Sequence, residues 1–226
     1  MTERTDASAP PDVHETVMEA TYRALCARGF ARLTMQNIAD EADVSSSLLH
    51  YHYDTKRDLL VAFLRYLLER FEEKFEDTED EDPEERLRGL VARMLPEDES
   101  VESDVGDGGT DAADDGGTED AEYDRFGLAI LEVRMQAPYE DAYREQLRTN
   151  MGVIRARIAD VIRDGVETGA FRDVDADRTA RLLVDALDGA RSERVTLGDD
   201  DAPGEVAAAL DEFVLSSLVA DGGDGR

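Results

Sequence analysis

The stretch that most constrains the fold runs from Phe30 to Lys56 and reads FARLTMQNIADEADVSSSLLHYHYDTK. Thr34 and Ser45 are residue types that commonly cap the first turn of a helix. Apolar residues follow each cap at helical spacing: Ile38, Ala39 and Ala42, then Leu48, Leu49 and Tyr53. Asp43 stands between them, where a tight turn requires a residue that tolerates the left-handed conformation. The stretch therefore predicts two short helices joined by a sharp turn.

Two short helices with this connection are typical of a helix-turn-helix, whose second helix enters the major groove of DNA. A wider pattern surrounds them, made of Gly29, Phe30, Thr34, Ile38, Ala39, Ala42, Val44, Ser45, Leu49, His52, Tyr53, Lys56 and Leu59. From Val13 to about Leu68 the sequence resembles the N-terminal DNA-binding domain of the tetracycline-repressor (TetR) family. In that family a glycine usually stands at the positions of Asp43 and Ser47, and a tyrosine at His50.

The resemblance, together with the small polar residues at the start of the second helix, suggests which residues approach DNA. They are Thr34, Met35, Ser45, Ser46, Ser47, His50, Tyr51, His52 and Lys56. Two of them have a plain structural alternative, because Thr34 could act as a cap alone and Tyr51 could simply pack within its helix. Ser47 adds a side chain where the family often brings the backbone close to a phosphate.

The chain of 226 residues carries 55 acidic and 25 basic residues, a formal charge of −30. One interpretation is a protein that mimics or repels nucleic acid. We favour adaptation to very high salt, which screens charge repulsion, because acidic residues are spread along the chain and only Lys56 and Lys74 are lysines. The composition is similar to that of proteins from extremely halophilic archaea. Residues 1–58 have a net charge of only −4, against −26 for residues 59–226, which favours DNA binding by the N-terminal part.

Helical periodicity continues to the C-terminus, and no strand pattern competes with it. We expect an all-α protein with two domains. The first is a helix-turn-helix DNA-binding domain over 12–58, with the motif itself at about 34–53, and the second is a helical ligand-sensing and dimerisation domain over 59–220. Long helices are expected after Thr55 and over 83–95, 140–168, 177–197 and 205–219.

Residues 97–122 read EDESVESDVGDGGTDAADDGGTEDAE and contain no basic residue. Such a segment buries too little apolar surface to offset the entropy of ordering, so we expect a disordered acidic insertion. It would be a solvated loop between two helices or, alternatively, a regulatory arm.

The C-terminal half resembles the same family more loosely, in VETGAFRDVD at 166–175 and LLVDALDGA at 182–190. The resemblance implies a homodimer in which the last two helices pair with their copies, through Leu183, Ala186, Leu187, Ala190, Val206, Leu210, Phe213 and Val214. It also implies a small-molecule effector, in a pocket that Phe63, Tyr66, Leu67, Phe126, Ile130, Met135 and Met151 could line. The alternative for both sets is burial within the chain's own core.

Other classes of function find little support. The sequence contains no G-x-S-x-G, G-x-G-x-x-G or G-x-x-x-x-G-K motif, so we expect neither an enzyme nor a cofactor. His50 and His52 would point about 200° apart on a helix, and His14 is distant in sequence, so we expect no metal site. No apolar run reaches the ~20 residues that span a membrane, and the N-terminus lacks a signal peptide, so we expect a cytoplasmic protein. Cys26 is expected in the core.

These observations predict a ligand-responsive transcriptional regulator, most simply a repressor. A dimer would place its two recognition helices about 34–36 Å apart on a near-palindromic double-stranded operator. The main alternative is a helical interaction protein that has lost specific DNA binding, which Ser47 and the negative charge would favour. A ligand-binding enzyme of helical fold is a weaker alternative.

Overall fold

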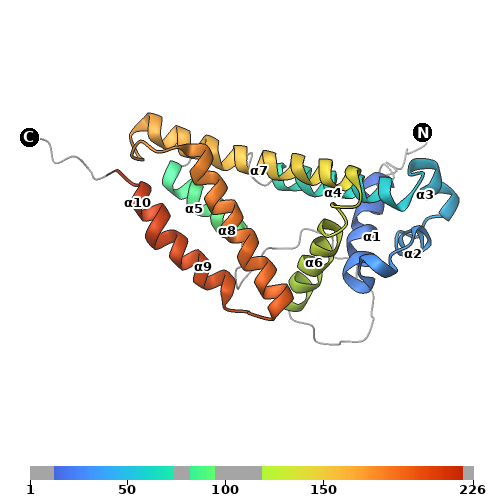
Figure 1. Ribbon diagram of the computed structural model, residues 1–226. Coiled ribbons are helices and arrows are strands. Elements are labelled where there is room, and N and C mark those ends of the chain that lie inside the picture. The colour runs from blue at the N-terminus through green and yellow to red at the C-terminus, as the bar shows by residue number, and fades with distance from the viewer. Residues whose placement is uncertain (1–12, 74–81, 95–118, 221–226) are drawn as a thin grey trace, which may run out of the picture.

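The computed structural model describes residues 13–73, 82–94 and 119–220, and within them it confirms the expected all-α fold (Figure 1). The N-terminal elements are α1 (Val13–Arg28), the 3₁₀ turn η1 (Phe30–Arg32), α2 (Met35–Glu41), α3 (Ser46–His52) and α4 (Lys56–Glu73). The others are α5 (Pro83–Arg93), α6 (Glu119–Arg134), α7 (Asp141–Thr168), α8 (Ala176–Leu197), α9 (Ala202–Leu210), the π-helical turn η3 (Asp211–Leu215) and α10 (Ser216–Leu218). In these ranges no helix is both long and apolar enough to cross a membrane.

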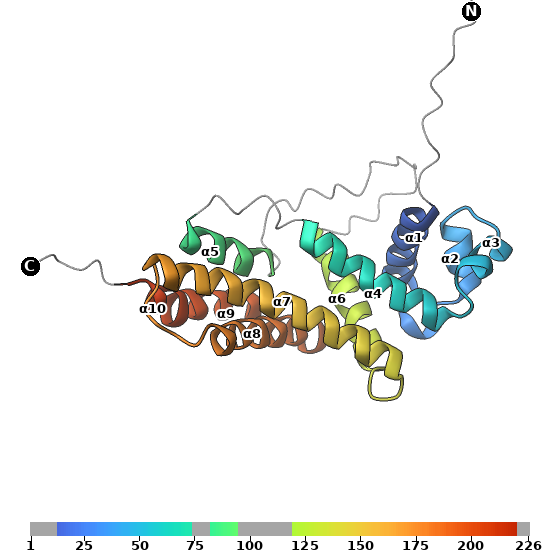
Figure 2. The same ribbon diagram turned by 90° about the horizontal axis from the view of Figure 1, so that it is seen from above.

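The helices α1 to α3 gather at one end of the molecule, and α8 to α10 lie toward the other (Figure 1). The 28-residue helix α7 runs between the two ends, with α4 and α5 packed along it (Figure 2). Helix α6 packs against α1 on one side and against α8 on the other. The helix-turn-helix is thus connected to the rest of the chain through α4, α6 and α7.

Buried apolar side chains form two clusters. The C-terminal core is built by α5, α7, α8, α9 and the segment that follows α9, and its largest fully buried members include Leu87, Ile158, Ile162 and Leu183. The N-terminal core contains residues of α1 to α4 together with Ala129 and Val133 of α6 and Tyr143 of α7. The predicted boundary at residue 58 therefore crosses a core instead of separating two cores.

Helix α6 begins at Glu119, inside the segment that we expected to be disordered, so that expectation is wrong for residues 119–122. Its first residues are Glu119 and Asp120. Composition alone did not reveal this. Residues 97–118 lie outside the described part of the chain.

The corner between α7 and α8 is closed by backbone pairing with the C-terminal segment. The Arg172 N–H donates to the Leu218 carbonyl at 2.8 Å, and the Ala220 N–H donates to the Ala170 carbonyl at 2.9 Å. This pairing turns Phe171 onto α7, where its ring lies against Gly165 and is 3% exposed. The contact requires a glycine, because a Cβ on Gly165 would lie 2.0 Å from the ring atom Cδ2.

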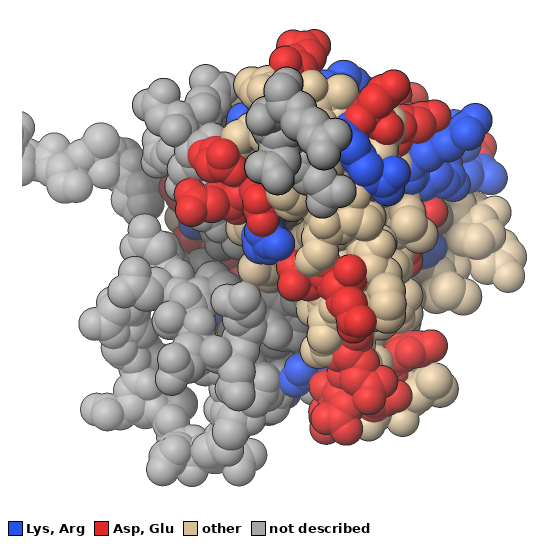
Figure 3. All heavy atoms as spheres, turned by 90° about the vertical axis from the view of Figure 1, so that its left-hand side faces the viewer, with Lys and Arg blue, Asp and Glu red and all other residues tan. Residues whose placement is uncertain are grey.

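On the surface, basic and acidic side chains are intermixed, as the face in Figure 3 shows. Arginines on α7 pair with aspartates on α8: the side-chain nitrogens and oxygens lie 2.6 Å apart for Arg155 and Asp185, and 2.8 Å apart for Arg163 and Asp177. Such exposed pairs contribute little individually to stability. They do show that arginines of this region are engaged within the chain.

We predict that Gly165→Ala destabilises the fold by about 2 kcal/mol or more, because the added methyl group overpacks the Phe171 contact. Gly152→Ala on the same helix is the matched control, since nothing lies within 4 Å of its added Cβ. That change should stabilise the protein by about 0.5–1 kcal/mol through helix propensity. Urea unfolding of both variants measures the difference, and equal midpoints would contradict the packing described here.

Candidate nucleic-acid interface

Two side-chain caps and one left-handed residue shape the helix-turn-helix. The Thr34 hydroxyl accepts a hydrogen bond from the Asn37 N–H at 3.1 Å, and the Ser45 hydroxyl accepts one from the Leu48 N–H at 3.1 Å. Asp43 has a φ of +52°, and it is the only non-glycine residue with positive φ among the described residues. The local geometry inferred from the sequence is therefore present.

Helix α3 directs its polar side chains outward. Ser47, His50 and His52 are exposed, and the Tyr51 ring is 83% exposed although its centroid lies 5.2 Å from that of the His52 ring. The opposite side of α3 is anchored by Leu49, which is 1% exposed in the N-terminal core. Although the protein as a whole is acidic, α3 carries no carboxylate. Its outer face offers hydroxyl, imidazole and phenol groups, which can contact phosphates and base edges.

A second contact fixes the end of α3 to the first helix. Nδ1 of His14 on α1 lies 2.8 Å from the hydroxyl of Tyr53, the residue that ends α3. The Val44 N–H also donates to the Ala39 carbonyl at 3.0 Å, which closes the turn between α2 and α3. The exposed face of α3 is consequently held on a packed support, as a binding site requires.

Most of the residues predicted to contact DNA lie on or beside α3. Thr34 and Ser45 are exposed and cap helices, but a capping hydroxyl still has its own proton to donate. Ser46 is half-buried, and Met35 is half-buried against the N-terminal core. Contact of these residues with DNA stays a prediction.

Lys56 differs from the other predicted contacts, because its side chain turns into the protein. Its Nζ donates to the Phe30 carbonyl at 2.6 Å and lies 4.1 Å from the centroid of the Phe30 ring. Burial lowers the pKa of the Lys56 ammonium, and the charge of Glu132 opposes that change. Lys56 therefore has a structural role in this conformation, and its contact with DNA stays a prediction.

Other exposed polar residues near the motif were not selected from the sequence. Arg57 follows Lys56, and its guanidinium pairs with Asp58 at 3.1 Å and lies 4.0 Å from Glu140. Gln36 is exposed on α2, and its amide donates to Asp40 at 2.7 Å. Arg32 is exposed on η1. Only the fold indicates which of these flanking residues face solvent.

Among the described side chains, no group of three or more His, Cys, Asp and Glu is placed to hold a metal ion.

The predicted effector-pocket residues do not come together at one place. Those in or against the N-terminal core are Phe63, Tyr66, Leu67, Phe126 and Ile130. Met151 packs against the C-terminal core instead, and Met135 is 61% exposed at the surface. The sequence could not separate these sets, because an apolar residue on a helical stripe does not reveal which neighbouring helix it faces.

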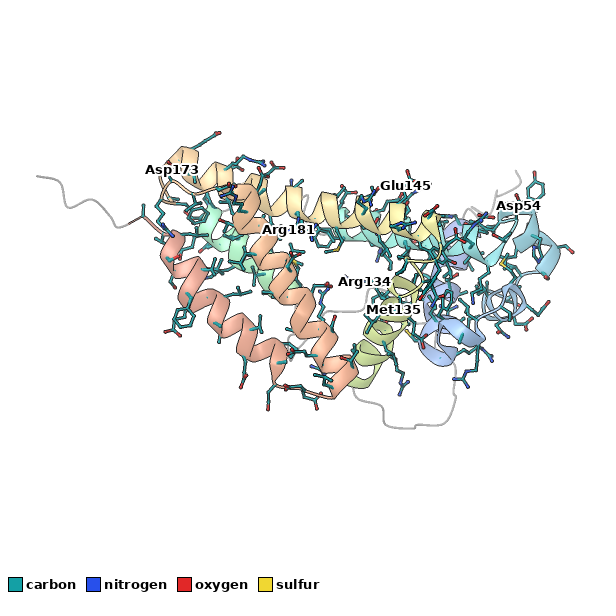
Figure 4. All side chains as sticks on the ribbon, in the orientation of Figure 1. Asp54, Arg134, Met135, Glu145, Asp173 and Arg181 are labelled. Atoms are coloured by element: carbon teal, nitrogen blue, oxygen red, sulfur yellow. The ribbon has the colours of Figure 1, made fainter. Side chains whose placement is uncertain are left out.

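Polar contacts join helices of the C-terminal part to one another and to α4. Arg134 on α6, labelled in Figure 4, forms two hydrogen bonds with Asp188 on α8, of 2.5 and 2.7 Å. This pairing raises the pKa of Arg134. The side-chain amide of Asn150 on α7 donates to the Leu64 carbonyl of α4 at 2.7 Å. Helices α4, α6, α7 and α8 are thus joined by polar contacts that a bound molecule could displace.

The predicted dimer residues also divide by burial. Leu183, Leu187 and Leu210 are at most 6% exposed and belong to the chain's own C-terminal core, so their side chains face inward, and Ala190 is 2% exposed. Ala186, Val206 and Val214 are half-buried against that core. Phe213 is 68% exposed, and Leu182, which the sequence analysis did not select, is 54% exposed.

This chain has a capped helix-turn-helix with an outward polar α3, joined to a larger helical part. These features place it in the class of helix-turn-helix proteins. Residues 17–63 match the family model "Bacterial regulatory proteins, tetR family", and residues 118–219 match "BetI-type transcriptional repressor, C-terminal". A TetR transcription regulator of known structure from Haloarcula marismortui is 38% identical, with a TM-score of 0.75 over 92% of this chain and 98% of that chain. The chain belongs to the TetR family.

Two further comparisons agree with this assignment. The HTH-type transcriptional regulator TtgR of Pseudomonas putida is 32% identical over 95 residues, which is 42% of this chain and 44% of TtgR. The match thus spans under half the length of that curated relative. The fold is also shared with a putative transcriptional regulator from Saccharomonospora viridis solved in complex with choline, at 23% identity and a TM-score of 0.71 over 94% of this chain and 100% of that chain.

We predict that the turn residue Asp43 tolerates glycine but not a β-branched residue. Asp43→Gly should keep or slightly raise stability, whereas Asp43→Val should cost about 1–2 kcal/mol relative to it, because the left-handed conformation crowds a branched Cβ. Thermal unfolding of the two variants side by side measures this difference. Equal stability would show that residue 43 does not hold a positive φ.

Proposed function

We propose that this protein is a ligand-responsive, DNA-binding transcriptional repressor that acts in the cytoplasm. The observation that carries the proposal is the outer face of α3, which is free of carboxylates and exposes Ser47, His50, Tyr51 and His52 from a buried anchor at Leu49. Phosphate contacts would position this face on a duplex, and contacts with base edges would supply sequence specificity.

The charge of the chain shapes how such binding would work. With a net charge of −30, the protein as a whole repels DNA at low salt. At about 1 M salt the Debye length falls to roughly 3 Å, so this repulsion is nearly abolished, but affinity from counterion release is also lost. We infer that affinity comes mainly from direct and water-mediated contacts of α3, with shape fit to the duplex.

We further propose that the protein binds a near-palindromic operator as a homodimer built by α8 and α9. The inward residues Leu183 and Leu210 would stabilise each subunit, and the exposed apolar residues Leu182 and Phe213 would face the partner. Small exposed residues on the same two helices, Gly189, Ala208 and Ala209, would permit close helix packing.

We infer that a small molecule releases the protein from DNA by entering among α4, α6, α7 and α8. Two neighbours of the same fold were solved with a small molecule, one with choline and one with stearoyl-CoA. Displacing the Arg134–Asp188 pair or the Asn150 contact would change how α6 or α4 sits. Thermodynamically, the effector must bind the DNA-incompetent state more tightly than the DNA-bound state.

The function is tested by selecting duplexes from a random library in about 1 M KCl, where charge repulsion is screened, and measuring affinity by fluorescence anisotropy. We expect Tyr51→Ala to weaken binding of the selected duplex about tenfold or more, as loss of a base or backbone contact does. Tyr139→Ala is the matched control, because Tyr139 is 88% exposed in the turn between α6 and α7. Failure to select any sequence from a folded dimer would instead favour the interaction protein.

The dimer is tested by placing a charge on the exposed part of η3, the turn that follows α9. We expect Phe213→Asp to shift the protein from dimer to monomer in sedimentation experiments, because an unpaired charge would be buried at the interface. Met135→Asp is the control, since Met135 is 61% exposed on the surface beyond α6. If both variants stay dimeric, the interface lies elsewhere.

A further inference from the structure

Both backbone polar groups of Phe30, the first residue of η1, are bonded to charged side chains. The Phe30 N–H donates to Oε2 of Glu132 on α6 at 2.5 Å, and the Phe30 carbonyl accepts from Nζ of Lys56 at 2.6 Å. Lys56 is the first residue of α4. The backbone of Phe30 is therefore bonded to charged side chains of α4 and α6, and we call this set of Phe30, Lys56 and Glu132 the Phe30 clasp.

The residue before Phe30 is shaped for this contact. Gly29 has a φ of +70° and a ψ of 165°, a conformation that side-chain-bearing residues rarely adopt. A Cβ at Gly29 would lie 2.9 Å from Oε2 and 3.4 Å from Oε1 of Glu132. A glycine thus serves two purposes here, the turn of the backbone and the approach of the carboxylate. In the sequence, Gly29 was noted only as part of the family pattern.

The charges within the clasp depend on one another. The Lys56 ammonium lies over the Phe30 ring, 4.1 Å from its centroid, and is partly removed from water. Burial lowers the pKa of Lys56, and the negative charge of Glu132 opposes this change in part. The Phe30 ring also meets the edge of Tyr143 on α7, with the ring centroids 6.4 Å apart. Contacts of both the backbone and the side chain of Phe30 therefore cross between the N-terminal elements and α6 and α7.

We propose that the Phe30 clasp fixes the helix-turn-helix to α6, and that Glu132 is a positioning residue for DNA binding although it lies outside the DNA-binding surface. The proposal rests on the proposed function as a DNA-binding regulator. Helix α6 also carries Arg134, which is bonded to Asp188 of α8. Arg134 and Glu132 lie two positions apart on α6. A shift of α6 caused at its contact with α8 would consequently also move the carboxylate that holds η1.

Electrostatics and the clasp make opposite predictions for a change at Glu132. Removing any carboxylate from a protein with a charge of −30 lowers its repulsion of DNA and, on charge alone, strengthens DNA binding. Loss of the clasp frees the Phe30 peptide and leaves Lys56 without its countercharge, which weakens DNA binding if the clasp positions α3. A second glutamate provides the control, because Glu145 is exposed on α7 and outside the clasp (Figure 4).

The experiment compares Glu132→Ala, Glu132→Gln and Glu145→Ala in the full-length protein, with two readouts. The first is the exchange rate of the Phe30 amide with deuterium, and the second is affinity for the duplex selected by the wild-type protein. We expect Glu132→Ala to raise the exchange rate and weaken DNA binding, each about tenfold, as loss of a charged hydrogen-bond partner does. Glu132→Gln keeps an acceptor oxygen and should restore much of the amide protection.

Glu145→Ala should leave Phe30 exchange unchanged and should keep or slightly strengthen DNA binding. The proposal is overturned if Glu132→Ala leaves Phe30 protected, or if both alanine variants change DNA affinity alike while the proteins remain folded dimers. If the wild-type protein selects no duplex, the proposed function fails and the positioning role fails with it. The exchange measurement would then still decide whether the Phe30 clasp itself forms.

Discussion

The structure depends most on the burial of one face of α4 between α1 on one side and α6 and α7 on the other. Leu59, Leu60 and Phe63 are fully buried there, in a core that also contains Ala129 and Val133 of α6 and Tyr143 of α7. The rings of Tyr22 on α1 and Phe126 on α6 lie 4.9 Å apart. Because close-packed interiors do not deform continuously, a shift of α6 or α7 must be accommodated by the helix-turn-helix. This shared core is the physical basis for expecting an effector to act on DNA binding.

Charge imposes the second constraint. The chain is strongly acidic, yet many of its arginines are engaged in pairs within the molecule, such as Arg134 with Asp188 and Arg155 with Asp185. Cations at the motif are engaged as well, because Lys56 bonds to Phe30 and Arg57 pairs with Asp58. The α3 face carries hydroxyl, phenol and imidazole groups and contains no lysine or arginine. Such a surface suits a solvent in which high salt already screens phosphate charge.

The sequence predicted what local chemistry determines. Helical spacing located the helices to within a few residues, and side-chain chemistry located the caps at Thr34 and Ser45 and the left-handed Asp43. These features depend on neighbours only a few positions away along the chain. The pattern of Gly29, Phe30 and Lys56 supported the family resemblance, but it did not reveal the contact with Glu132, which is 102 positions from Phe30.

What the sequence did not predict depends on the third dimension. A helix of the C-terminal part has apolar residues on more than one side, and periodicity does not show which side meets the chain's own core. Leu183 and Leu187 therefore appeared as interface residues although they face inward, whereas the exposed Leu182 was not selected. The start of α6 at Glu119 and the π-helical turn at Asp211–Leu215 likewise departed from expectations based on composition and helical spacing.

We infer from the shared burial that the helix-turn-helix and α6 form one cooperative core. Native-state hydrogen exchange at increasing denaturant concentration tests it most directly, because it gives an opening free energy for each helix. The structure predicts that the buried amides of α1, around Val17 to Leu25, and those of α6, around Ala129 to Val133, exchange through one common opening. If α1 to α3 open together at a clearly lower free energy while α6 stays protected, the two parts unfold independently and do not form one cooperative core.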